Sequence, residues 1–282
     1  MLIRRPVVAG RFYPAAAEIL AHEARAYLEE GAASAEGGMA ASPWGLMLPH
    51  AGHIYCGRVL GATLAGVALP RTLVILCPNH TGQGRALGVW PSGAWLTPLA
   101  PLPVDAELAA ALVETDGGFV ADTRCHLGEH AIEVILPFLQ VASGPERPLR
   151  IVPVCVGTQR ATALRDAGKA LAAVLAERQK KGEATGVIVS SDMNHYEDEC
   201  RTAQKDALAL ERALACDPEG LLATTERERI SMCGAGPLAL TLFAARRLGK
   251  PRAEFVIHDT SAAVSGDTER AVGYAGLRLF LS

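Results

Sequence analysis

Polar loops that contain histidine follow three short apolar runs of this chain. The loop side chains are His50 and His53 after the first run, His80 after the second, and Asp192 and His195 after the third. In open α/β sheets, loops at the carboxyl ends of the strands converge over one edge, and ligands bind there. Imidazole and carboxylate groups are common metal ligands. The spacing therefore predicts one cleft lined with metal-binding side chains. Taken singly, His50 or His80 could instead be a loop histidine bonded to backbone, and we expect His53 to support a ligand or contact substrate.

Cys233 is the cysteine whose sequence surroundings best suit chemistry. It lies in Ser-Met-Cys-Gly-Ala-Gly-Pro (231–237), directly before an apolar helical run, with Pro237 suited to the first helical turn. A helix N-terminus favours the thiolate, so we expect Cys233 to be a metal ligand or a nucleophile with a lowered pKa. Cys77 and Cys155 lie inside strand-like runs and are predicted to be buried apolar residues.

A fourth candidate segment contains His126, Glu129 and His130 in the spacing His-x-x-Glu-His. This spacing resembles the inverted zinc-protease signature, in which one helix presents both histidines. Gly128 interrupts the segment and favours another interpretation. In this second interpretation, His126 lies in a loop, and Glu129 and His130 lie at the start of a helix and line the cleft wall.

Short apolar runs and longer helical runs alternate along the chain, as is typical of an α/β fold with a largely parallel or mixed sheet. We predict a single domain over residues 1–282, with helices flanking a central sheet, and a surface loop at residues 32–41. The predicted strands are residues 46–48, 73–76, 151–156 and 187–189, with two late antiparallel strands at 255–257 and 275–281. The predicted helices are residues 59–69, 106–114, 132–142, 161–180, 201–215 and 238–248.

The composition excludes several classes of protein. Half of the 282 residues are hydrophobic and 20% are charged, which excludes a disordered chain. The net charge of −3 argues against a nucleic-acid partner or an anionic membrane surface. The seven cysteines are scattered without a Cys-x-x-Cys pair, so we expect neither a disulfide framework nor a zinc ribbon, and we expect a cytoplasmic location. Prolines interrupt the longest uncharged window, residues 86–104, which excludes it as a membrane helix.

Six ordered motifs resemble those of the Memo family, whose prokaryotic members are called AmmeMemoRadiSam system protein B. They are PHAGHIYCG (49–57), CPNH (77–80), EHAIEVILPF (129–138), the VP-VG segment (152–157), SSDMNHY (190–196) and MCGAGP (232–237). The resemblance covers essentially the whole chain. It implies one α/β domain similar to class III extradiol dioxygenases, which are non-haem iron enzymes.

The resemblance also implies a metal site formed by His50, His80 and Cys233, with Asp192 and His195 nearby. The dioxygenases have glutamate where this family has cysteine, which argues against ring cleavage and favours softer metals. Within such a site His195 could act as an acid or base towards substrate, with Asp192 as an orienting group or a ligand.

Three hypotheses follow from these residues. The first is redox chemistry by iron(II) or copper on an unknown small molecule or peptide. The second is a hydrolase in which the same residues hold zinc and lower the pKa of bound water. The third is a non-enzymatic module that binds a peptide or protein in the same cleft. The family name implies a radical-SAM protein and an Ammecr-type protein as partners.

Overall fold

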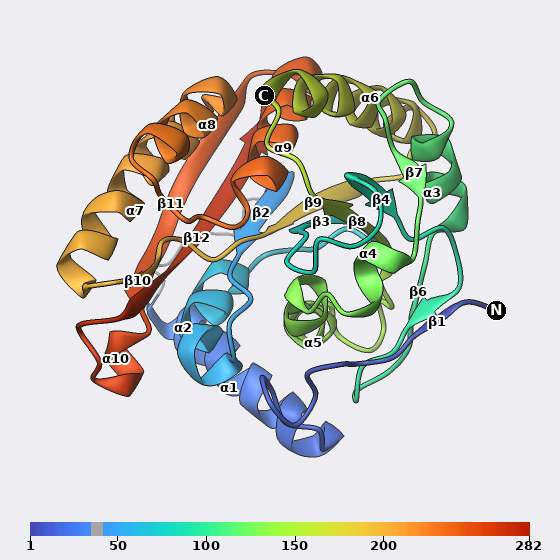
Figure 1. The fold of residues 1–282 in the computed structure, drawn as a ribbon. Helices are drawn as coiled ribbons and strands as arrows, with labels where there is room; N and C mark the ends of the chain where they lie inside the picture. Colours follow the sequence, from blue (N-terminus) through green and yellow to red (C-terminus); the bar gives the residue numbers. More distant parts are fainter. Residues whose placement is uncertain (35–41) are drawn as a thin grey trace.

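The computed structural model describes residues 1–34 and 42–282, which form a single α/β domain around a large mixed sheet (Figure 1). Its strands are β1 (Ile3–Arg4), β2 (Gly45–Leu48), β3 (Thr72–Pro78), β4 (Leu87–Val89), β5 (Ala94–Trp95), β6 (Leu102–Pro103), β7 (Val120–Ala121), β8 (Arg150–Val156), β9 (Thr185–Ser190), β10 (His195–Glu197), β11 (Pro251–Thr260) and β12 (Ala271–Leu281). Its helices are α1 (Ala17–Ser34), α2 (His53–Leu64), α3 (Ala106–Val113), α4 (Arg124–Leu127), α5 (Ala131–Ser143), α6 (Ala161–Lys180), α7 (Glu199–Leu214), α8 (Pro218–Arg227), α9 (Ala235–Leu248) and α10 (Ala262–Ser265).

The large sheet has the strand order β10-β12-β2-β9-β3-β8-β4-β7, and β11 pairs with β12. The central pairs β2–β9, β9–β3 and β3–β8 are parallel, whereas β12 pairs with β2, and β4 with β8, in the antiparallel sense. β11 and β12 run antiparallel to their neighbours, as predicted from the sequence, and they pair with each other, which was not predicted. A smaller sheet has the order β1-β5-β6. The mixed, mostly parallel α/β fold predicted from the sequence is confirmed.

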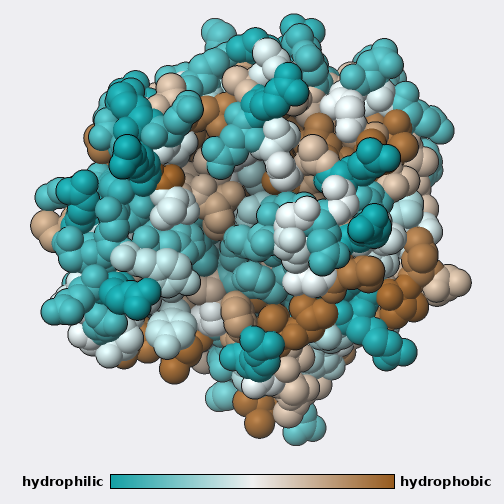
Figure 2. Space-filling model, viewed as in Figure 1, coloured by the Kyte–Doolittle hydropathy of each residue, from teal (hydrophilic) through white to brown (hydrophobic). Residues whose placement is uncertain are grey.

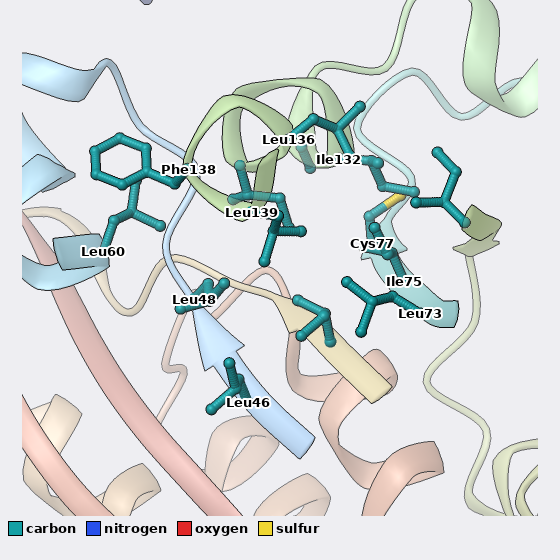
Figure 3. Packing of buried hydrophobic residues seen from close by; sticks show 14 of the residues in the cluster. Leu46, Leu48, Leu60, Leu73, Ile75, Cys77, Ile132, Leu136, Phe138 and Leu139 are labelled. Atoms are coloured by element: carbon teal, nitrogen blue, oxygen red, sulfur yellow. The ribbon is translucent and has the colours of Figure 1, made fainter. Parts of the chain in front are cut away.

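Helices cover both faces of the sheet, which explains why its central strands are apolar without interruption. On β3 the side chains alternate: Leu73, Ile75 and Cys77 pack in one cluster, and Val74 and Leu76 pack in another. Figure 3 shows the first set facing Ile132, Leu136 and Leu139 of α5. The second set packs with residues of α3, α6 and α9. The sheet is thus packed between two layers of helices, which position the ends of its central strands.

The first helix after β2 differs from its prediction. The sequence predicted residues 59–69, but α2 runs from His53 to Leu64 with Gly52 as its N-cap. It ends before Gly66, whose φ of 68° leaves the right-handed helical region. Val67 and Leu69 are buried in the following turn, so their hydrophobicity reflects the core rather than a helix. The other predicted strands and helices lie within a few residues of observed ones.

Some elements carried too little sequence signal to be predicted. The strands β1, β4, β5, β6, β7 and β10 have two or three residues each, and α8 was also missed. The predicted loop at residues 32–41 is corrected in part: its first residues belong to the end of α1, and residues 35–41 lie outside the described residues.

The crossing of α1 and α2 depends on glycine at the contact. A Cβ atom added to Gly61 would lie 2.1 Å from the carbonyl oxygen of Tyr27, and one added to Gly31 would lie 2.7 Å from the backbone of Ala62. Real Cβ atoms do not approach backbone this closely, so the two helices would have to separate. Small residues at both positions let the two backbones meet.

Replacing Gly61 by alanine is expected to lower the free energy of unfolding by about 1–3 kcal/mol, the usual cost of overpacking. Urea unfolding followed by circular dichroism measures the change. Gly128→Ala is the control, because its added Cβ would be 3.5 Å from its nearest neighbour, an ordinary contact. Equal stability of Gly61→Ala and the wild type would mean that the helices are not in close contact.

Figure 2 shows the molecular surface from the same side as Figure 1. This face is mostly hydrophilic, with apolar residues gathered near the N-terminal segment. In that segment Met1 is 95% exposed, and Leu2 and Ile3 are also exposed. Within residues 1–34 and 42–282, the helices are all too short or too polar to cross a membrane.

Candidate metal centre

Three histidines from separate segments converge at the carboxyl edge of the sheet. His50 follows β2, His80 follows β3, and His130 immediately precedes α5. Their candidate ligand atoms all lie within 4.8 Å of one another, and the ring centroids are 5.1–5.6 Å apart. This is the only such group of potential metal ligands in the described part of the chain. β2 and β3 bring His50 and His80 to the same edge because both strands belong to the parallel part of the sheet, and the start of α5 adds His130.

Ser190, the last residue of β9, fixes the orientation of the His50 ring. Its Oγ donates to the carbonyl of Ala131 at 2.7 Å, and it lies 2.7 Å from Nδ1 of His50. Because the serine hydroxyl has one proton and uses it on the carbonyl, Nδ1–H of His50 is the donor in the second bond. Burial and the neighbouring histidines hold the pKa of His50 well below its ordinary value. His50 is therefore neutral, with the lone pair of Nε2 directed away from Ser190.

Glu129 fixes the orientation of the His80 ring. Its Oε2 accepts the backbone N–H of His80 at 2.6 Å, and its Oε1 lies 2.9 Å from Nδ1 of the ring. Oε1 also accepts the N–H of Ala131 at 3.0 Å and lies 3.6 Å from Nδ1 of His130. Burial alone would raise the pKa of Glu129, but its hydrogen bonds lower it, so it remains ionised. Carboxylate partners of this kind orient metal-binding histidines.

Cys233 lies beside His50, at the opposite side of the ring from Ser190. Its Sγ is 3.4 Å from Nε2 of His50 and accepts the N–H of Asp192 at 3.2 Å. Gly234 allows this approach, since a Cβ there would lie 2.2 Å from the side chain of Ser191. Cys233 thus lies beside His50, but its sulfur is not among the ligand atoms that lie within 4.8 Å of one another, which belong to His50, His80 and His130.

The expected lowering of the Cys233 pKa is wrong. Although the residue stands just before α9, burial of the sulfur and the charge of Asp192 raise its pKa. Desolvation disfavours the charged thiolate, and the negative charge of Asp192 disfavours it further. Without a cation beside it, Cys233 is a protonated thiol.

Asp192 and His195 follow β9 and flank the cluster. Oδ1 of Asp192 accepts the backbone N–H of His50 at 2.7 Å, and burial raises the pKa of Asp192 to about 7. Nδ1–H of His195 donates to the carbonyl of Ser231 at 3.0 Å, which leaves its Nε2 unprotonated in the neutral ring. Burial lowers the pKa of His195. Tyr196, which follows it, has a φ of 63°, an uncommon value for a non-glycine residue.

His53 lies away from the histidine cluster. It is 1% exposed, Nε2–H donates to the carbonyl of Val134 at 2.9 Å, and Nδ1 lies 3.0 Å from a carboxylate oxygen of Glu23. Its ring also stacks on Tyr13 at 5.3 Å. Both ring nitrogens thus face acceptors, and His53 helps to pack α1 and α5 against α2 rather than line the cleft as expected.

His126 and His130 do not form a shared site, so the resemblance to the inverted zinc-protease signature is misleading here. His126 is fully buried in α4, and its Nε2–H donates to the carbonyl of Gly88 at 3.0 Å. Its ring lies against Trp90 and Trp95. Gly128 ends α4, and the chain turns before α5, which separates the two histidines. His130 points instead into the cluster with His50 and His80.

Two features of the site were missed from the sequence. Ser190 belongs to the SSDMNHY motif, but the sequence assigns it no role, because its bond to His50 depends on β2 and β9 being neighbours. His130 was expected at the cleft wall, whereas its ring nitrogen is as close to His50 and His80 as a third ligand would be. The only sequence feature that could have indicated this place for His130 is its position directly after Glu129.

Comparison with known proteins gives one consistent result. The family model described as Memo-like protein matches residues 4–278. A MEMO1 family protein of Methanopyrus kandleri is 39% identical over 281 residues, covering 97% of this chain and 98% of the relative. MEMO1 family proteins of Thermotoga neapolitana and Thermotoga maritima are 40% and 39% identical over 97% and 98% of this chain. With sequence similarity along its whole length and the motif histidines gathered at one sheet edge, this chain belongs to the Memo family.

Proposed function

We propose that His50, His80 and Cys233 bind iron(II) or copper and that the protein carries out redox chemistry on a substrate bound at this edge of the sheet. The observation that carries the proposal is the way the imidazoles are held. Ser190 and Glu129 each occupy Nδ1 of one ring, so that Nε2 of both His50 and His80 is available inside one cluster.

The donor set fits such an ion. Two neutral imidazoles with a thiolate suit copper and iron, because sulfur is a soft, electron-rich ligand. Asp192 N–H, which now donates to the sulfur of Cys233, would stabilise the thiolate when the thiol loses its proton to bind metal. A bound ion of this kind would supply electron transfer to or from the substrate.

Proton transfer in this proposal belongs to His195 and Asp192. The neutral ring of His195 keeps Nε2 free to accept a proton, because Nδ1–H is used on Ser231. The raised pKa of Asp192, about 7, lets that carboxyl exchange a proton near neutral pH. Its bond to the backbone of His50 keeps it beside the cluster during that exchange.

A second candidate is a zinc hydrolase, and one observation favours it. His130 joins His50 and His80 in a three-histidine group, the ligand set of some catalytic zinc sites. In that case Cys233 would not be a ligand, and a bound zinc ion would supply an acidic water molecule at an open position. The two candidates differ in metal and in third ligand.

Elemental analysis of anaerobically purified protein tests the proposal, together with a redox titration of the loaded protein. We expect stoichiometric iron or copper in the wild type, loss of that metal in His50→Ala/His80→Ala, and a reversible redox transition. His22→Ala, which changes an exposed histidine of α1, is the control. Stoichiometric zinc with no redox transition would favour the hydrolase, and equal metal content in the double variant would exclude this site.

Ser190→Ala should weaken metal binding by about 10–100-fold, the usual effect of losing the hydrogen-bond partner of a metal-binding histidine. Without the hydroxyl, nothing fixes the proton on Nδ1 of His50, and the ring is free to turn. Competition with a chelator measures the affinity. Ser143→Ala, at the surface end of α5, should leave it unchanged. Unchanged affinity in Ser190→Ala would show that His50 needs no such support.

A further inference from the structure

The opposite edge of the large sheet contains a cavity that the histidine site does not use. Its volume is about 690 Å³, and it lies where β3 and β8 begin, beside the start of α3 and the end of α6. Small-molecule sites usually have volumes of about 300–1,000 Å³. His50 and His80 follow the carboxyl ends of β2 and β3, so the length of the strands separates the two places.

Positive charge is in excess in this cavity. Of its four arginines, Arg178 is already neutralised, since its guanidinium lies 2.7 Å from a carboxylate oxygen of Asp105 and 2.7 Å from one of Glu183. The remaining carboxylate, Glu107, lies within 4.0 Å of Arg178 and 3.8 Å of Lys181. Every acidic side chain that lines the cavity therefore has a cationic partner.

The other three arginines, Arg71, Arg147 and Arg150, form no ion pair or side-chain hydrogen bond with the described residues. In a chain whose net charge is −3, three unpaired guanidinium groups around one cavity are a local reversal of charge. Like charges gathered in a concave surface concentrate the potential and attract anions.

Two of these arginines stand on rigid backbone. Arg150 opens β8 and is the register partner of Thr72 in β3, and its N–H donates to the carbonyl of Arg71 at 2.7 Å. Arg71, directly before β3, and Arg150, at the start of β8, are thus held side by side by the sheet. Arg147 approaches from the turn after α5, and apolar surface of Pro70, Pro103 and Leu149 completes the lining.

We propose that this cavity binds a phosphate-bearing small molecule of the nucleotide class. Guanidinium groups form paired hydrogen bonds with phosphate oxygens, and the three free arginines match a group with several negative charges. The proline and leucine surface matches a flat ring such as a nucleobase. The proposal is independent of the metal site and adds a second ligand to the protein.

Isothermal titration calorimetry at 0.15 M salt tests the proposal with three probes: ADP, inorganic pyrophosphate and adenosine. We expect saturable binding of ADP, weaker binding of pyrophosphate, and none of adenosine. The double variant Arg71→Ala/Arg150→Ala should weaken ADP binding at least tenfold. Arg147→Ala should do so too, and because Arg147 lies in a turn, this substitution should not disturb the sheet. Arg227→Ala, at the end of the distant helix α8, is the matched control and should bind as the wild type does.

Several results would overturn the proposal. They are non-saturable binding of ADP, equal weakening in Arg227→Ala and in the cavity variants, and tight binding of adenosine. The variant His50→Ala/His80→Ala should still bind ADP. If it did not, the anion would be binding at the histidines and the cavity would not be its site.

Discussion

Replacing Arg4 by methionine is expected to lower the free energy of unfolding by about 3–5 kcal/mol, the cost of leaving one member of a buried ion pair alone. Arg4 is 1% exposed and Glu133 is fully buried, and their side chains form a close ion pair. The substitution keeps most of the volume of the side chain, so the loss arises from the carboxylate that remains without its counter-charge.

The size of the effect follows from how many groups meet at this pair. Glu133 also accepts the N–H groups of Val7 and Val8, each at 2.9 Å, and the hydroxyl of Tyr13 at 2.7 Å. Arg4 in turn donates to the carbonyl of Glu129. The pair thus fastens the N-terminal segment to α5 and to the loop that carries Glu129.

Chemical unfolding measures this prediction, and Arg5→Met is the control. Arg5 is the exposed neighbour of Arg4, and substitutions at exposed positions usually change stability by no more than about 0.5 kcal/mol. If both variants lost the same stability, the buried pair would have no special role. Arg4 donates to the carbonyl of Glu129, whose carboxylate contacts the His80 ring. We therefore also expect the folded Arg4→Met variant to bind metal more weakly than the wild type does.

Cys233→Ser is expected to weaken binding of copper or iron by more than about 100-fold, beyond the effect of losing an outer hydrogen-bond partner. The hydroxyl of serine stays protonated at neutral pH and is a poor ligand for a soft metal. The variant should also lose the absorption band that arises from charge transfer between sulfur and metal. His130→Ala should keep this band and change the affinity much less.

The reverse result would favour the three-histidine site. Loss of metal in His130→Ala with normal binding in Cys233→Ser would identify His130 as the third ligand and support the zinc hydrolase. Cys200→Ser is the control for general effects of removing a thiol, since Cys200 is exposed at the start of α7.

The central part of the fold was predictable because its signal is local. β3 and β8 are short apolar runs bounded by polar residues, and a run of that kind is typical of a strand covered on both faces. The two-residue strands could not be predicted, since they exist only through their neighbours: β1 pairs with β5 and β5 with β6. The pairing of β1 with β5 joins residues about ninety apart in the chain.

For the candidate site, the sequence could identify which residues have suitable side chains, but not where each side chain points. His50 and His53 belong to the same short motif, yet Ser190 orients one and Glu23 and Val134 surround the other. Those partners come from three distant segments, so no local pattern separates a cluster histidine from a packing one. The direction of the Cys233 pKa shift could not be predicted for the same reason, because the burial and the Asp192 charge that raise it come from tertiary contacts.

The order of strands in the sheet also governs how the protein can be made. β2 is synthesised early, yet it lies between β9 and β12, which follow it by more than one hundred residues in the chain. During translation its backbone groups and apolar side chains must remain without their final partners, and such exposed edges are prone to aggregation. Cys233 also emerges long after His50 and His80. We therefore expect the nascent chain to depend on chaperones, and metal to enter only after release from the ribosome.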